Sequence, residues 1–284
     1  RAMYTWRFLL LAWRLRHEYD SVFVHMNQEY VVIAGWLWEL LGKRAYLWRN
    51  HYAGSWLTDV AAVFCTKVFC TSKHSYTAKY KKTILMPVGV DVERFDSGGR
   101  VERKPHSILF LARIAPSKHP EVLIEALSIL TQRGIGFTAS LVGSPLSKDE
   151  SYYAELQKKV RSLMLDQYVS FLPGVPNEET PDLYHSHEIF VNASPSGMFD
   201  KTIFEAAVSG CFVLSSSTDV AGITGSAFIF GDAEDLAKHL MHILSLSEQE
   251  QMVLARSLKD EAVRTHSLMA LGNRLAQEMG VYSA

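Results

Sequence analysis

Two basic residues, Arg113 and Lys118, lie between an apolar run at 107–112 and a helical pattern at 120–133. The guanidinium of an arginine can donate to two phosphate oxygens at once, whereas the ammonium of a lysine acts as a compact point charge. Together at a strand-to-helix turn, the two side chains could clamp a diphosphate. Two basic residues in a loop are also ordinary solvated surface, so the interpretation depends on what else reaches this turn.

The stretch 194–215 offers a second kind of chemistry. A turn of small residues leads through Asp200 into a short helical pattern, which ends at Gly210 before an apolar strand. The free N–H groups and the positive dipole end of such a helix suit a phosphate. Glu205 could accept hydrogen bonds from a ribose diol. The simpler alternative is that Thr202 caps the helix and Glu205 completes a capping box.

Two further turns follow strand-like runs and point to the same sheet edge. They contain Gly143 in LVGSP, and Gly174 with Val175 in FLPGVP. Four turns at one edge indicate a pocket for a nucleoside diphosphate. The sequence has no Gly-x-x-x-x-Gly-Lys, Gly-x-Gly-x-x-Gly or Gly-x-Ser-x-Gly pattern. ATP hydrolysis, NAD redox chemistry and a serine nucleophile on an elbow are therefore disfavoured.

Polar residues also follow strands in the first third of the chain. His25 and Asn27 come after a strand at about 21–26, and His51 follows one at about 44–49. Ligands of open α/β sheets bind at the carboxyl ends of the strands. A single histidine at such a position usually has a structural role. With two histidines at equivalent strand ends, a functional role and a structural role are about equally probable.

Helical and strand patterns alternate along the whole chain, and the strands are apolar on both faces. This is typical of parallel sheets covered by helices, and it predicts an α/β fold with two Rossmann-like domains. The polar, Gly-rich segment 96–106 is the predicted linker. We therefore expect domains at 1–95 and 96–265, with a last helix at about 266–284 packing back on the first.

The composition bounds the partners and the compartment. The chain has 284 residues, 48% of them hydrophobic, and a net charge of −1, so the bulk charge does not favour nucleic acid. Cys65, Cys70 and Cys211 lie in apolar runs, which predicts buried free thiols in a cytoplasmic protein and no zinc site. No apolar run approaches the length of a membrane span.

The first helical pattern, 2–17, places arginines beside aromatic residues. Packing on the core is the preferred interpretation, and peripheral attachment to the inner face of a membrane is the alternative. The chain begins at Arg1 and exposes an unpaired sheet edge near several tryptophans. We therefore expect either more chain upstream of Arg1 or, less favoured, a second copy in a homodimer covering this edge.

Five segments in order resemble the family 4 retaining glycosyltransferases of GT-B fold: MPVGVDVERF, LFLARIAPSKHPEVLIEAL, LVGSP, VSFLPGVP and residues 189–215. The resemblance covers about 84–284 well and only the later strands before that, so the first domain is incomplete relative to the family. It implies two Rossmann-like domains facing across a cleft. It also implies transfer of a sugar, with retention, from a nucleotide-diphospho-sugar to a hydroxyl of a glycan or lipid-linked acceptor.

The resemblance assigns roles to individual residues. Arg113 and Lys118 match the diphosphate clamp, and Glu205 matches the glutamate that holds the donor ribose. Val175 lies where the backbone meets the base. His51 resembles a histidine near the sugar and the acceptor, with the weaker candidates His25 and Asn27 at the neighbouring strand end. No metal or cofactor is expected, because the two cations neutralise the leaving diphosphate.

The sequence departs from the family around the sugar. Gly197 replaces the first of two glutamates, and Met198, Phe199 and Asp200 replace the residues, usually glycines, that follow. Asp200 and Lys201 could take over contacts to sugar hydroxyls. A catalytically silent GT-B module that binds a nucleotide or a partner is the main alternative, and a nucleotide-sugar epimerase is a third.

Overall fold

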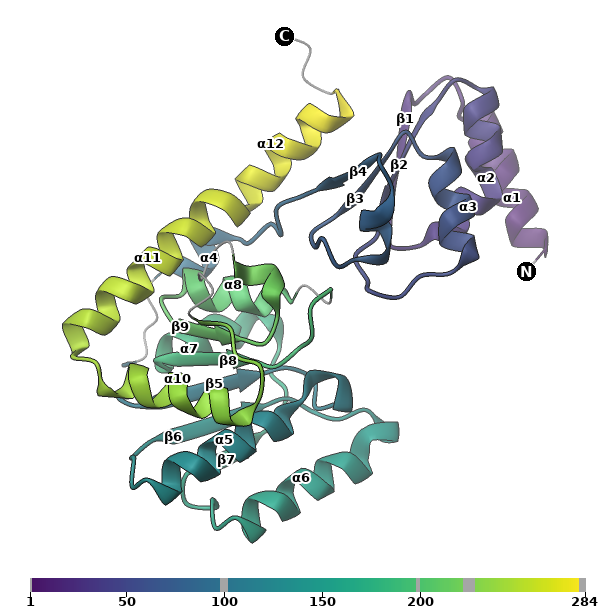
Figure 1. The fold of residues 1–284 in the computed structure, drawn as a ribbon. Coiled ribbons are helices and arrows are strands. Elements are labelled where there is room, and N and C mark those ends of the chain that lie inside the picture. The colour runs from purple at the N-terminus through teal and green to yellow at the C-terminus, as the bar shows by residue number, and fades with distance from the viewer. Residues whose placement is uncertain (1, 98–101, 198–199, 222–227, 281–284) are drawn as a thin grey trace. The chain divides into compact units, whose positions relative to one another are not determined.

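The computed structural model describes residues 2–97, 102–197, 200–221 and 228–280 (Figure 1). The chain divides into two compact units. Unit 1 comprises Arg1–Met86 with Ser196–Phe199, and unit 2 comprises Pro87–Pro195 with Asp200–Ala284. Each unit is an α/β layer structure built on its own parallel sheet.

Unit 1 contains a four-stranded sheet in the order β1-β2-β3-β4, with every neighbouring pair parallel. Its strands fall where the apolar runs predicted them. Its elements are α1 (Ala2–Arg14), β1 (Ser21–His25), α2 (Gln28–Leu40), β2 (Arg44–Trp48), α3 (Trp56–Phe64), β3 (Lys67–Cys70), the 3₁₀ helix η1 (Tyr76–Lys79) and β4 (Thr83–Leu85).

The core of unit 1 forms where α2 and α3 cover the sheet. Val31 and Ala34 of α2 and Ala61 of α3 are fully buried against it. Gly35 lets the two helices approach closely, because a Cβ there would stand only 2.6 Å from the Cβ of Phe64. The unit therefore holds its helices tightly on one side of the sheet.

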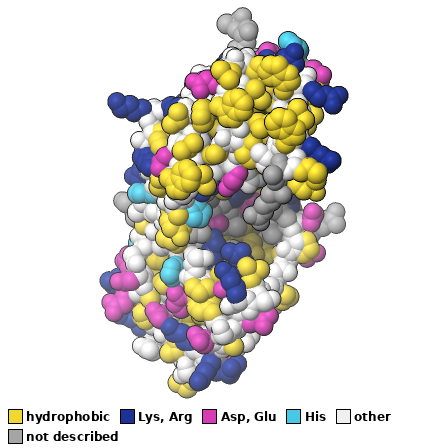
Figure 2. Space-filling model, turned by 90° about the vertical axis from the view of Figure 1, so that its right-hand side faces the viewer, with side chains coloured by type: hydrophobic (Ala, Val, Ile, Leu, Met, Phe, Trp, Pro, Cys, Tyr) yellow, Lys and Arg dark blue, Asp and Glu magenta, His cyan; other side chains and the backbone are white. Residues whose placement is uncertain are grey.

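The outward-facing side chains of α1, β1 and α2 are largely apolar and exposed. Figure 2 shows hydrophobic side chains gathered over this unit. In α1 the side chains of Phe8 and Leu9 pack on the core, whereas most of the others do not. The exposed large hydrophobic residues of α1, β1 and α2 are Met3, Tyr4, Trp6, Leu10, Leu11, Trp13, Phe23, Tyr30, Trp36 and Leu40.

Unit 2 contains a five-stranded parallel sheet in the order β7-β6-β5-β8-β9. Its elements are α4 (Val92–Asp96), β5 (Ser107–Leu111), η2 (Pro116–Lys118), α5 (Pro120–Gln132), β6 (Thr138–Val142), η3 (Ser147–Asp149), α6 (Glu150–Ser162), β7 (Val169–Leu172), η4 (Asn177–Glu179), α7 (Thr180–Ser186), β8 (Ile189–Asn192), α8 (Lys201–Val208), β9 (Phe212–Ser215), η5 (Thr218–Val220), α10 (Ala233–Ser245), α11 (Glu248–His266) and α12 (Leu268–Met279).

The strand order of unit 2 reverses at one place. From β5 the chain adds β6 and β7 on one side, then returns to place β8 and β9 on the other. Helices α5, α6 and α10 cover one face of the sheet, and α7 and α8 lie on the other (Figure 1). In such sheets the ligand crevice lies at the carboxyl ends of the two strands that flank the reversal, here β5 and β8.

The boundary between the units lies at Met86 and Pro87, before the polar segment predicted as the linker. Residues 87–96 belong with unit 2, where Val90 accepts a hydrogen bond from the amide of Leu268 at 2.7 Å. α12 is also counted in unit 2. Its packing on the first domain and the facing of the two units across a cleft stay predictions.

Two simpler expectations concern the thiols and the membrane. Cys65, Cys70 and Cys211 are buried and free, as predicted. Across the described ranges, no helix is both long and apolar enough to cross a membrane.

Candidate functional site

The turn after β5 places Arg113 and Lys118 at the carboxyl edge of the sheet of unit 2. Arg113 is exposed, directly beyond the strand. Pro116 starts the single 3₁₀ turn η2, which ends at Lys118 and brings the lysine side chain inward to an exposed fraction of only 13%. The two cations therefore share an edge and differ in environment: one is solvated, and the other is largely enclosed.

Lys118 is held by an anion that sequence reasoning did not pair with it. Its Nζ lies 2.5 Å from Oδ2 of Asp200, with a longer bond of 3.3 Å to Oγ of Ser194. The same carboxylate oxygen accepts from Ser194 at 2.8 Å and from Nδ2 of Asn192 at 3.1 Å. Asn192 ends β8, so this cluster joins the ends of β5 and β8, the two strands at the reversal.

The start of α8 differs from the expected capping box. The helix begins at Lys201 with Asp200 as its N-cap residue, and no side-chain bond closes the cap. Thr202 therefore lies inside the helix, and its Oγ1 is buried with no hydrogen-bond partner among the described atoms. The interpretation of Thr202 and Glu205 as a capping box is wrong, because the helix starts at Lys201, two residues before the start that Thr202 as N-cap would give.

Glu205 lies on the inner side of α8 and is only 7% exposed. Tyr184 of α7, which is fully buried, donates its hydroxyl to Oε2 of Glu205 at 3.2 Å. Burial raises the pKa of the Glu205 carboxyl, whereas Lys201 and the bond from Tyr184 lower it. This bond uses one carboxylate oxygen, and no other hydrogen bond to this side chain is found among the described residues.

The two glycines in the turns after β6 and β7 have different structural surroundings. At Gly143 the φ angle is +156°, and a Cβ would stand 1.9 Å from the carbonyl oxygen of Ala112. Gly143 therefore allows the turns after β6 and β5 to touch. Gly174 has ordinary space around it and donates its amide to Oγ of Ser144 at 3.0 Å. Val175 follows, half-buried in the same turn.

Gly197 is required by conformation. Its φ is +87°, and a Cβ would come 2.9 Å from Cβ of Tyr52 and 3.0 Å from the carbonyl oxygen of His74, all within unit 1. A glutamate here would need both strain and displacement. Met198 and Phe199 lie outside the described residues.

The candidate residues of unit 1 lie at the carboxyl edge of its own sheet. His51 is held close to its own turn: its Nδ1 is 2.9 Å from the amide nitrogen of Ala53, and its ring stacks on Tyr52 at 4.6 Å. His25 and Asn27 are exposed and line a hollow beside β1 with apolar side chains. Their position relative to the residues of unit 2 stays a prediction.

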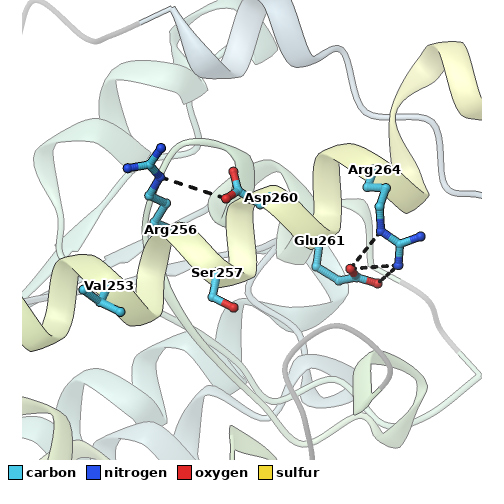
Figure 3. A pocket seen from close by; sticks show the side chains of 6 residues that line it. All are labelled: Val253, Arg256, Ser257, Asp260, Glu261 and Arg264. Carbon is cyan, nitrogen blue, oxygen red and sulfur yellow. Dashed lines mark hydrogen bonds and ion pairs between the residues drawn. The ribbon is translucent and has the colours of Figure 1, made fainter.

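A second hollow, on α11, is shown in Figure 3. Its charges are satisfied along the helix: Arg256 pairs with Asp260 at 4.0 Å and Arg264 with Glu261 at 2.7 Å. It has no link to the strand ends and is a solvated helix face. Among the described residues, no three His, Cys, Asp or Glu side chains gather closely enough to hold a metal ion.

Solved structures of other proteins share this architecture. The Anabaena protein HepE in complex with UDP aligns with a TM-score of 0.80 at 18% identity, covering 98% of this chain and 82% of that one. Sucrose-phosphate synthase from Thermosynechococcus elongatus aligns with a TM-score of 0.73 at 15% identity, covering 96% and 76%. The fold class is therefore that of the GT-B glycosyltransferases, as predicted.

Sequence comparison identifies the family. Residues 105–246, half of the chain, match the model of the Glycosyl transferases group 1. Mannosylfructose-phosphate synthase of Agrobacterium fabrum is 30% identical over 147 residues, 48% of this chain and 32% of that protein. D-inositol 3-phosphate glycosyltransferase of Nocardia farcinica is 28% identical over 159 residues, 52% and 35%. The chain belongs to the group 1 glycosyl transferases, and the matched stretches span about a third of these two relatives.

Three polar residues of the site escaped sequence reasoning. Asn192, at the end of β8, and Ser194, two residues beyond it, hold Asp200, and Tyr184 holds Glu205. The first two stand in the run NAS after an apolar strand, a position that could have drawn attention to them. Nothing in the sequence indicated the role of Tyr184, because the pattern of its helix predicts only that an aromatic side chain is buried there.

Proposed function

We propose that this protein transfers a sugar from a nucleotide-diphospho-sugar donor to a hydroxyl of an acceptor, with retention of configuration. The carrying observation is the meeting of Lys118, Arg113 and the start of α8 at the carboxyl ends of β5 and β8, in a chain of the group 1 family. Cations and free amide groups at such an edge favour a phosphate. Related folds crystallised with UDP and UDP-glucose support a donor of this class.

The residues divide the work as follows. Arg113 and Lys118 bind the donor diphosphate and stabilise the charge that develops on it as the sugar leaves. In this proposal no metal ion is needed for that step, because the cations supply the positive charge. Glu205, positioned by Tyr184, accepts from the ribose hydroxyls, and the turn containing Gly174 and Val175 contacts the base.

The acceptor side rests on unit 1. His51 lies beside the sugar and acceptor in this proposal, with His25 and Asn27 in supporting positions, and the acceptor is a glycan or a lipid-linked saccharide. The compartment proposed is the cytoplasm, with the inner membrane face as the place of a lipid-linked acceptor. Three buried free thiols support a reducing compartment.

A catalytically silent nucleotide-binding module is the second candidate. Two observations favour it: Gly197 leaves no room for the glutamate that the family resemblance implies at this position, and Lys118 is already paired with Asp200. The two candidates agree on nucleotide binding and differ in turnover.

A thermal-shift panel of UDP, GDP, ADP and their sugar conjugates tests the shared part. A ligand at a hundred times its Kd adds about 2.7 kcal/mol of stability, so one base should raise the melting temperature clearly. Slow release of free sugar from the matching donor then supports the transferase, and binding without release supports the silent module. No shift with any nucleotide contradicts both.

A further inference from the structure

We infer that Asp200 is a built-in competitor for the phosphate site: its carboxylate occupies Lys118 in the empty protein and must yield when the donor diphosphate binds. This inference rests on the proposed function of the same edge. It concerns how the site selects and admits an anion.

The first observation is the enclosure of the pair. The side chains of Lys118 and Asp200 are 13% and 22% exposed, and their charged atoms are 2.5 Å apart. When one partner of an enclosed ion pair is removed, the other charge is left desolvated and uncompensated, so the two partners hold each other in place. An incoming phosphate therefore meets an ammonium whose charge is already neutralised.

The second observation is the unused cap of α8. Aspartate is among the preferred N-cap residues, yet Asp200 makes no side-chain bond to the helix it precedes. Its carboxylate is instead drawn to Lys118, Ser194 and Asn192. A second arrangement is therefore available, in which the carboxylate leaves the lysine and accepts from the free amide groups of α8.

In the proposed exchange, the donor diphosphate replaces the Asp200 carboxylate as the partner of Lys118. In the empty protein the carboxylate bonds the ammonium, and the start of α8 stays uncapped. When a diphosphate arrives, it takes the ammonium, and Asp200 turns to the helix or to a sugar hydroxyl of the donor. A singly charged anion gains too little from Lys118 to displace the carboxylate, so the pair favours diphosphates over weaker anions.

The test uses inorganic pyrophosphate, which carries no base and no sugar, titrated calorimetrically into the whole chain. The variants are Asp200→Asn, Lys118→Ala, the double variant, and Asp166→Asn as a control for net charge, because Asp166 is an exposed acid in the loop before β7. Asparagine is also a good N-cap residue, so Asp200→Asn should fold. Asp200→Ser provides a second, shorter replacement, and far-ultraviolet circular dichroism checks both.

Asp200→Asn should bind pyrophosphate about tenfold more tightly than the parent, the scale of one charge-assisted bond. With Lys118 replaced by alanine, the same change should gain no more than about twofold, because the two residues act as a coupled pair. Asp166→Asn should bind like the parent. Unchanged or weaker binding by Asp200→Asn overturns the inference, and so does an equal gain in both backgrounds.

Nucleoside diphosphates in parallel separate this inference from the proposed function. If Asp200→Asn binds pyrophosphate tightly while neither it nor the parent binds a nucleoside diphosphate, the competitor role is supported and the donor function is contradicted. If the parent binds a nucleoside diphosphate and Asp200→Asn gains nothing, only the inference fails. If no variant binds either probe, both fail.

Discussion

The carboxyl edges of the two sheets use their polar side chains differently. In unit 1, Oδ1 of Asn50 accepts from Oγ1 of Thr71 at 2.8 Å and from Oγ of Ser75 at 3.2 Å, and the guanidinium of Arg49 donates to the carbonyl oxygen of Met26 at 3.3 Å, so bonds to neutral acceptors tie one loop to the next. In unit 2 the corresponding edge carries the enclosed pair of Lys118 and Asp200 beside the exposed Arg113.

This difference separates structural from functional polarity. Neutral bonds satisfy a strand end at little cost, whereas an enclosed ion pair costs desolvation and adds little to stability. Because the enclosed ion pair adds little to folding stability, its position at the strand reversal of a parallel sheet is better explained by ligand binding. The edge of unit 2 is therefore where charge is held ready for a ligand.

The largest expected effect concerns the backbone contact that forms this edge. Gly143→Ala places a methyl group 1.9 Å from the carbonyl of Ala112, so unit 2 should lose about 3 kcal/mol or more of unfolding free energy. Gly174→Ala is the matched control, because its nearest neighbour, Ser144, is 3.5 Å away, and it should change stability by no more than about 0.5 kcal/mol. Urea unfolding followed by circular dichroism measures both. Equal costs would show that the close approach at Gly143 is not what holds the two turns together.

The second prediction is that acid loosens unit 2 before unit 1. Burial lowers the pKa of His266 from 6.5 to about 4, and burial also lowers the pKa of His185 and His187. The unfolded chain therefore takes up these protons first. The neutral histidines contribute fully to the unfolding free energy of unit 2 above pH 6.5. By pH 4, protonation of His266 in the unfolded chain alone lowers this free energy by roughly 3 kcal/mol.

Unit 1 has a different acid-sensitive group. Hydrogen bonds from Lys79 and two tyrosines lower the pKa of Asp59 from 3.8 to about 2, so its contribution is lost only as the pH falls below 3.8. The raised pKa of Glu205 in unit 2 offsets part of the histidine effect, because protonation of that carboxyl favours the folded state.

The tryptophans allow the two units to be followed separately. All six belong to unit 1: Trp6, Trp13, Trp36, Trp38, Trp48 and Trp56. Between pH 7 and 4.5, the urea midpoint by circular dichroism should fall more than the midpoint by tryptophan fluorescence. His266→Gln, which keeps an acceptor for the amide of Val88, should reduce the difference. A fluorescence midpoint that falls first would reverse the comparison.

A smaller effect is expected at Tyr184. Tyr184→Phe removes the hydrogen bond that positions Glu205 and should weaken ribonucleotide binding by about 1 kcal/mol. Binding of the 2′,3′-dideoxy analogue should change little, because it has no diol for Glu205 to hold. Glu205→Gln should show the same selectivity. Equal weakening of both nucleotides would indicate a purely structural role for the tyrosine.

Much of the architecture could be predicted because it is local. The apolar runs located the strands, and Pro and Gly located the turns, so the strand ends with Arg113 and His51 were found directly. The start of α8 was misplaced because Thr202 and Glu205 match a capping box, whereas tertiary bonds hold Asp200 and set the helix start at Lys201.

The pairing inside the site was beyond sequence reasoning. Lys118 and Asp200 are 82 positions apart, and only the neighbouring positions of β5 and β8 bring them together. The contact boundary between the units, at Met86 and Pro87, lies before the polar segment 96–106 that composition marks, because the contacts of Val90 with Leu268 tie residues 87–96 to unit 2.

The central claim is that the charged edge of unit 2 binds the donor diphosphate, and Arg113 tests it most directly because its exposed side chain can be removed without disturbing the core. Calorimetric titration should compare the parent, Arg113→Ala and Arg133→Ala, a control arginine that follows α5 at the opposite end of that helix. The account predicts that Arg113→Ala binds the preferred nucleoside diphosphate more weakly by about 1.5–3 kcal/mol, with nucleoside binding and the control unchanged. Equal diphosphate binding by Arg113→Ala and the parent would contradict it.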